Sequence, residues 1–179
     1  MMVGCLMAGG MRARYDPAKD KIIDDKSEDH WEEGYRLNPK SIYEIDSRDF
    51  NAQDFREKTE GKVVKCIAPG ILAHVKHGDK IVYMTRDYDE IRESHDYARL
   101  GSLRYDKDEY EAMMDDTWRK LSKLNAVKFN YPEVVQAPVK HFKILKMLGW
   151  PIHVGRAAAE VNPDYYRFRN TGTEVRYAS

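Results

Sequence analysis

The sequence predicts an α/β protein in which helices cover a mainly parallel sheet. Short apolar runs rich in β-branched residues alternate along the chain with amphipathic patterns typical of helices. Strands that alternate with helices of about 10 to 20 residues favour a layered fold with a parallel sheet. The chain has 179 residues, and domains of about 100 to 200 residues can bury a sizeable core. We therefore treat residues 1–179 as a single domain.

The first ten residues, MMVGCLMAGG, could be a signal peptide, a lipid anchor or part of the mature fold. A secretory signal needs a basic leader followed by an apolar run of about 7 to 15 residues, and the segment shows neither. Myristoylation requires glycine at position 2, where this chain has Met2. The segment is therefore expected to belong to the mature fold.

A polar stretch follows and then a first strand is predicted. Residues 12–41 carry charge clusters and little apolar periodicity, which predicts a long loop with one helical turn near 27–33. Ser47 is a suitable N-cap for a short helix that Gly61 would end. The run KVVKCIAPG at 62–70 has the character of a buried strand.

The next segments continue the alternation. The run KIVYMTRD at 80–87 predicts a second strand, and the preceding ILAHVKH fits either a strand or a helical turn. AVKFNY at 126–131 predicts a third strand. Helices are predicted at 87–101, where Gly101 ends the run, at 106–125, and at 137–150, where Pro138 stands in the first turn and Gly149 ends the helix.

Composition limits the partners that the chain can be expected to have. The 30 basic and 30 acidic residues give no net charge, so we expect neither nucleic acid nor a membrane as partner. No apolar run approaches the roughly 18 residues of a membrane-spanning helix. Cys5 and Cys66 are too few for a disulfide framework and lack zinc-site spacing. A reducing, cytoplasmic location and no metal are the corresponding expectations.

The most informative stretch is YMTRDYDEIRES, because ligands of open parallel sheets bind beyond the carboxyl ends of the strands. Arg86 stands where the second strand should end, and Ser94 lies eight residues later in the following helix. A guanidinium, a helix N-terminus and a hydroxyl on one side would together favour a phosphate. The alternative is a surface pair of Arg86 with Asp87 or Asp89, with Ser94 merely solvated.

Several stretches, in order and spacing, resemble the bacterial sulfotransferase-like family. They are GKVVKCIAPG, KIVYMTRDYDEIRESHDY, FNYPEVVQAPVKHFKILKMLGWPI and AAEVNPDYYRFRN, together with AGGMRARYDP and NPKSIYEID. The resemblance implies a three-layer α/β/α fold of the P-loop nucleoside triphosphatase type. It also implies sulfuryl transfer from 3′-phosphoadenosine-5′-phosphosulfate to a hydroxyl or amine acceptor on a small molecule, glycan or peptide. Arg86 and Ser94 would hold the 3′-phosphate of this co-substrate. Asp87 also fits the family motif, but we expect it to have a structural role.

The sequence departs from that family at its beginning. The family opens with a central strand and a loop of the type PRSGTS, which grips the 5′-phosphosulfate, whereas this sequence holds no such pattern. MMVGCLMAGG resembles the helix that follows this loop, so the resemblance implies a first helix that ends at Gly9 and Gly10. Half of the co-substrate site is therefore missing, and the 179 residues are expected to be inactive in transfer. Three explanations stay open: a start downstream of the true one, a degenerate relative that binds without catalysis, or completion by a partner strand. The neighbours of a missing central strand would either close up or expose unpaired edges.

The remaining candidates have plainer interpretations. His74 and His77 lack a third ligand at metal spacing, and the stripe Tyr110, Met113, Met114 and Trp118 is typical of a core. In the tail, Arg169 is a candidate second anion ligand, implied only by a weak likeness of RFRNTGTE to eukaryotic sulfotransferases; a tail packed on the sheet edge is the alternative. A homo-oligomer is compatible with the sequence. The competing class is a non-catalytic nucleotide-binding or structural protein, for example a viral one, that reuses the scaffold.

Overall fold

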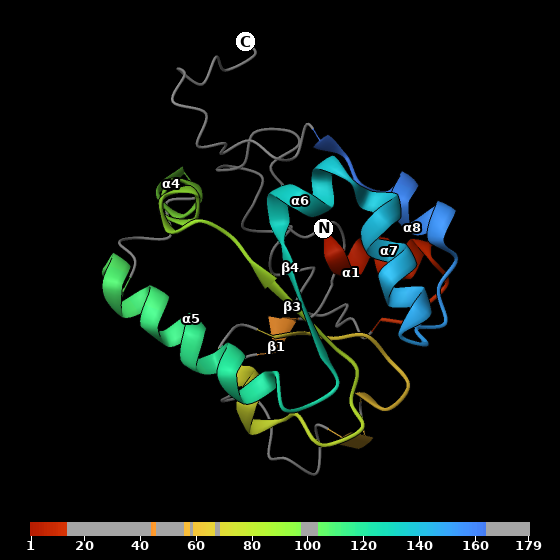
Figure 1. The fold of residues 1–179 in the computed structure, drawn as a ribbon, viewed down its shortest axis with the longest axis horizontal. Coiled ribbons are helices and arrows are strands. Elements are labelled where there is room, and N and C mark those ends of the chain that lie inside the picture. The colour runs from red at the N-terminus through yellow and green to blue at the C-terminus, as the bar shows by residue number, and fades with distance from the viewer. Residues whose placement is uncertain (14–43, 46–55, 58, 67–68, 98–103, 164–179) are drawn as a thin grey trace, which may run out of the picture.

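The computed structural model describes residues 1–13, 44–45, 56–57, 59–66, 69–97 and 104–163, with no side-chain description at 95–97. Strands β3 (Ile81–Thr85) and β4 (Ala126–Asn130) form a parallel pair, in register from Ile81 opposite Ala126 to Thr85 opposite Asn130 (Figure 1). The protein is thus of mixed α/β type with a small parallel sheet, as predicted.

A second parallel pair joins β1 (Glu44–Ile45) to β2 (Lys65–Cys66). Val63, just before β2, also makes a parallel bridge to Ala13. Of the strand expected at 62–70, the described residues are paired at 63, 65 and 66, and Gly70 belongs to a 3₁₀ helix instead. In the described part of the chain, β2 and β3 are not neighbours in one sheet, so these two strands do not close up against each other.

Most of the described chain outside the strands is helical. The helices are α1 (Met2–Ala8), the 3₁₀ helix η1 (Gly70–Ala73), α4 (Tyr88–Tyr97), α5 (Lys107–Leu121), α6 (Tyr131–Gln136), α7 (Pro138–Met147) and α8 (Val154–Ala159). Four of the α-helices, α1, α4, α5 and α7, lie where helices were predicted. The segment ILAHVKH, which fits either a strand or a helical turn, begins within η1. The loop expected at 12–41 and the body of the helix expected from Ser47 lie outside the described residues.

Helix α5 begins at the residue that its sequence predicts. The Asp106 carboxylate accepts from the Glu109 backbone N–H at 2.9 Å, and the Glu109 side chain accepts from the Asp106 N–H at 3.2 Å. This reciprocal capping box satisfies two backbone donors that a helix start would otherwise leave without partners. The pattern D-x-x-E therefore fixes the start of the longest helix.

Alternate residues of β3 point to opposite faces of the β3–β4 pair and enter two separate cores. On one face Ile81 and Tyr83 are buried with Leu121 of α5, and Met114 and Trp118 pack against them. The Tyr83 ring stacks on Trp118 with centroids 5.8 Å apart, and its hydroxyl donates to the Met114 carbonyl at 3.0 Å. Of the stripe predicted as core, Met114 and Trp118 are confirmed, whereas Tyr110 and Met113 are half-buried and belong to neither cluster.

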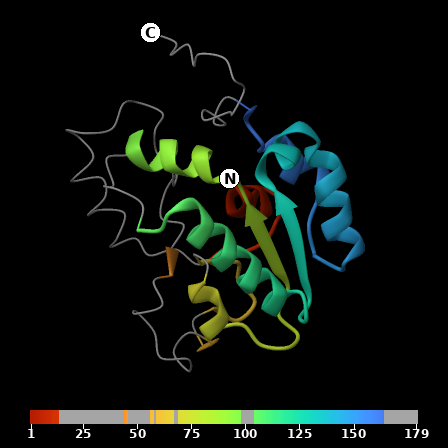
Figure 2. The same cartoon turned by 60° about the vertical axis from the view of Figure 1, so that its left-hand side comes forward.

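On the other face, Val82 and Met84 pack against a larger cluster built by α1, α6, α7 and α8. Its most deeply buried side chains are Cys5, Leu6, Val134, Phe142, Leu145 and Ala157. Figure 1 shows α1, α7 and α8 together on one side of the strands, and Figure 2 shows α5 and α7 on opposite sides of them. The opening segment of the chain is therefore an integral part of the core.

Glycines end α1 and α7 in the same way. Gly10 (φ 102°) and Gly149 (φ 79°) adopt the left-handed conformation just after the helix. The N–H of Met11 bonds to the Leu6 carbonyl, and that of Trp150 to the Leu145 carbonyl, both at 3.0 Å. These six-to-one bonds are Schellman motifs, and each places the following apolar residue on the core.

Gly149→Ala is expected to destabilise the protein by about 1 to 2 kcal/mol, because a Cβ is disfavoured in the left-handed region. Gly155→Ala is the matched control. Gly155 lies inside α8, where a Cβ meets only ordinary contacts at 3.5 Å or more, so alanine should raise the stability by up to about 1 kcal/mol. Urea denaturation followed by circular dichroism measures both. Equal effects of the two substitutions would contradict the assignment of Gly149.

Candidate functional site

Parallel pairing brings together the residues that follow β3 and β4. Thr85 and Asn130 form the last pair of the ladder, so Arg86 and Tyr131 leave the sheet side by side. The Arg86 guanidinium carbon lies 5.2 Å from the centroid of the Tyr131 ring, a cation–π contact. The strand-end position predicted for Arg86 is therefore observed, and the register adds a tyrosine beside it.

The carboxylate that pairs with Arg86 is Glu90. The Nε–H of Arg86 donates to Oε2 of Glu90 at 2.8 Å, and the two side chains are only 20% and 5% exposed. Glu90 lies one helical turn after Arg86, at the spacing of four residues that places side chains on one face. The ion pair is thus withdrawn from solvent, unlike the surface pair considered from the sequence.

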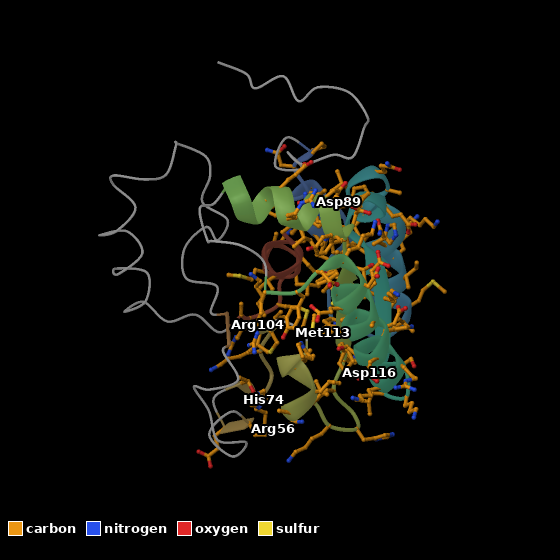
Figure 3. The ribbon with its side chains drawn as sticks, turned by 90° about the vertical axis from the view of Figure 1, so that its left-hand side faces the viewer. Arg56, His74, Asp89, Arg104, Met113 and Asp116 are labelled. Carbon is orange, nitrogen blue, oxygen red and sulfur yellow. The ribbon has the colours of Figure 1, made fainter. Side chains whose placement is uncertain are left out.

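The two aspartates of that alternative have other partners in the structure. Asp87 accepts from the backbone N–H groups of Asp89 and Glu90, at 2.8 and 3.4 Å, and so caps the start of α4. Asp89, labelled in Figure 3, pairs with Arg92 at 3.0 Å. Asp87 therefore has the structural role that was expected of it.

Ser94 lies on α4 one turn beyond Glu90 and is half-buried. The series of four-residue steps from Arg86 through Glu90 to Ser94 places the three residues along one side of the helix start. Arg169, the third predicted ligand, lies outside the described residues. The structure therefore brings Arg86 and Glu90 into contact and places Ser94 on the next turn of the same face.

Tyr131 and Cys5 add uncharged groups to this region. Burial raises the pKa of Tyr131; the Arg86 cation opposes this shift, and Cys5 and Glu90 add to it. Burial likewise raises the pKa of Cys5 to about 11. A thiol with so high a pKa is protonated at neutral pH and is a poor nucleophile. The charged groups that contact each other here are therefore Arg86 and Glu90.

This arrangement is suited to binding an anion rather than to acid–base or nucleophilic chemistry. A guanidinium carries five N–H donors, so one bond from Nε to Glu90 is compatible with a second, anionic partner. The buried carboxylate opposes that anion and orients the guanidinium at the same time. Glu90 and Tyr131 were not singled out from the sequence. The spacing of four residues from Arg86 points to Glu90, and the position at the end of the strand predicted at 126–131 points to Tyr131.

Two histidines, His74 and His141, are buried in the structure. His74 is buried just after η1, and Figure 3 shows it close to Arg56, whose Nη2 donates to the His74 carbonyl at 3.3 Å. His141 is buried on α7, with Nδ1 2.9 Å from the Ala137 carbonyl and its ring edge-on to Phe129. Among the described residues no three His, Cys, Asp or Glu side chains gather as a metal-binding group.

No family model, curated protein or solved structure matches the chain. The resemblance to sulfotransferases thus depends on the quoted stretches of sequence. Within the part of the chain that the structure describes, the helices are too short or too polar to cross a membrane.

Proposed function

We propose that the chain is a sulfotransferase-like protein with a three-layer fold of the P-loop nucleoside triphosphatase type. Its ligand is the adenosine 3′,5′-bisphosphate part of 3′-phosphoadenosine-5′-phosphosulfate, with the 3′-phosphate at Arg86 and Ser94. The observation that carries the proposal is the position of Arg86 directly after a parallel strand and directly before a capped helix. Ligands of parallel sheets bind at this edge.

Sulfuryl transfer to a hydroxyl or amine acceptor belongs to the proposal as the reaction of the whole site. Such a transfer requires donors aimed at the charge that develops on the transferring group. The sequence has no loop of the PRSGT type to provide them. We therefore expect these 179 residues to bind the nucleotide without catalysing transfer.

The buried Arg86–Glu90 pair favours one alternative, a non-catalytic structural or interaction protein. In that case the guanidinium serves only to neutralise Glu90, and no nucleotide competes for it. A protein can retain a buried ion pair because the pair specifies one packing arrangement. The two functions differ in whether a 3′-phosphate binds at all, which makes them separable by a binding measurement.

Removing the guanidinium is expected to weaken binding of adenosine 3′,5′-bisphosphate by about 10- to 100-fold, the magnitude of a charge-assisted hydrogen bond. Isothermal titration calorimetry of the wild type and Arg86→Ala measures this loss. Arg92→Ala is the matched control, because Arg92 is exposed on the same helix and should leave affinity unchanged. Equal affinity of the wild type and Arg86→Ala would count against the site.

A second pair of variants separates binding from folding, because Arg86→Ala leaves Glu90 buried without this cation. Glu90→Gln keeps an acceptor for Arg86 and removes the negative charge, so it should bind the bisphosphate several-fold more tightly. Adding Arg86→Gln to Glu90→Gln leaves two neutral amides and should abolish that gain. Unchanged affinity across this pair, with native circular dichroism, would assign Arg86 to structure alone.

A further inference from the structure

The outward face of α7 is basic and partly apolar. It consists of Val139, Lys140, Lys143, Lys146 and Met147, which we call the α7 face; all five are exposed. Met147 keeps 86% and Val139 47% of its surface exposed, although the opposite side of the helix is core. Large apolar side chains among lysines on a helix face are typical of surfaces that bind a partner.

The α7 face has no acidic neighbour on its own helix. Residues 138–147 read PVKHFKILKM and contain no aspartate or glutamate. Within the described ranges, Lys140, Lys143 and Lys146 form no ion pair with another residue. The three charges are therefore available to an anionic partner.

A face of opposite charge lies on α5. It consists of Asp108, Glu111, Ala112 and Asp115, which we call the α5 face; all four are exposed at spacings of three and four residues. Glu111 has one loose pair, with Lys107 at 4.0 Å. Among the described residues, Asp108 and Asp115 make no ion pair. Ala112 leaves space between the carboxylates for an apolar side chain.

The two faces cannot meet within one molecule. Leu121 of α5 packs on one side of the β3–β4 pair, and Phe142 of α7 is buried in the core on the other side. Figures 1 and 2 show α5 and α7 on opposite sides of these strands. Each face is therefore directed away from the other and toward a different neighbour.

We propose that the α7 face of one molecule docks on the α5 face of a second copy of this chain. Lysines 140, 143 and 146 then meet Asp108, Glu111 and Asp115, and Met147 packs beside Ala112. Contact between two α7 faces would bring three lysines against three lysines, which electrostatics disfavours. The contact is therefore heterologous, and repetition gives a ring or an open chain of copies.

Light scattering over a range of protein concentrations tests this proposal. At low salt the weight-average mass should climb with concentration above the 20.9 kDa of one chain. It should return to that value at about 0.5 M salt, where screening is effective beyond about 4 Å. A mass of one chain at every concentration in low salt would overturn the proposal.

Charge-reversal variants test whether the α7 face and the α5 face form the contact. Lys140→Glu with Lys143→Glu on α7, or Glu111→Lys with Asp115→Lys on α5, should each give single chains. Mixing the two double variants should restore association, because each reversed face then meets its complement in the other variant. Lys123→Glu, exposed beyond the end of α5, is the control and should associate as the wild type does.

Two results of this experiment would refute the proposed occupant. Association that survives both reversals would place the contact elsewhere on the molecule. Binding of the α7 face to vesicles of anionic lipid, with single chains in solution, would identify a membrane surface instead of a second copy. Circular dichroism of each variant verifies that the fold is retained.

Discussion

Phe142→Ala is expected to lower the free energy of unfolding by about 3 to 5 kcal/mol, the cost of removing a large aromatic side chain from a closed core. Phe142 lies on α7 with none of its surface exposed, in the cluster that also holds Leu6 and Ala157. Its removal opens a cavity between α7 and the helices α1 and α8. Urea denaturation measured by circular dichroism and tryptophan fluorescence gives the change.

The control lies on the same helix. Met147→Ala removes a side chain of which 86% is exposed, so stability should change by less than about 0.5 kcal/mol. A loss of similar size for both variants would show that α7 does not pack by the face that carries Phe142. A negligible loss for Phe142→Ala would contradict the position of the core itself.

Glu90→Ala is the second variant with a large expected effect, about 2 to 4 kcal/mol of lost stability. Glu90 is 5% exposed and its ion-pair partner Arg86 is 20% exposed, so alanine leaves a largely buried cation without this carboxylate. The range is set below that of a fully buried pair because the guanidinium retains some contact with water. Glu93→Ala, at an exposed position of the same helix, should have little effect.

A double variant distinguishes the pair from its separate members. Arg86→Ala combined with Glu90→Ala removes both charges and should be more stable than Glu90→Ala alone, because no uncompensated charge remains. Losses that simply add would mean that the two residues do not interact. Denaturation at matched salt concentration provides the comparison.

The sequence predicted the elements that carry a long, regular pattern. Helix α5 repeats apolar residues over four turns and begins with a capping box, and α7 has proline in its first turn and glycine after its end. Both signals are local, so they are readable without the fold. Strands β3 and β4 are short apolar runs rich in β-branched and aromatic residues, and they were predicted for that reason.

The elements that were missed are short. Helices α6 and α8 have six residues each, which is less than two turns and too few to display a helical period. Within the described residues, the strand predicted at 62–70 is paired at Val63, Lys65 and Cys66, because pairing depends on partners far away in sequence. Both errors therefore concern tertiary context, which one segment does not contain.

The candidate site likewise combines a residue that its own segment predicts with contacts that depend on the fold. Arg86 was predicted from its place at a strand end, a property of its own segment. Its contact with Tyr131 depends on the register between β3 and β4, whose residues are 45 positions apart in sequence. Glu90 was within reach of a sequence argument, since arginine and glutamate four residues apart on a helix often pair.

The buried carboxylate of Glu90 repels any anionic ligand of this site. An anion that reaches Arg86 must offset the repulsion from Glu90 at close range. A phosphate that also accepts from Ser94 and lies near the start of α4 gains a hydroxyl donor and the helix dipole. Selectivity for a 3′-phosphate is therefore the central claim of the proposed function.

Calorimetric comparison of adenosine 3′,5′-bisphosphate with adenosine 5′-monophosphate on the wild type tests that claim most directly. The two ligands differ only in the 3′-phosphate, so we expect the bisphosphate to bind at least about tenfold more tightly. This difference should disappear in Arg86→Ala. Equal affinity of the wild type for both ligands, or binding of neither, would contradict the proposed function.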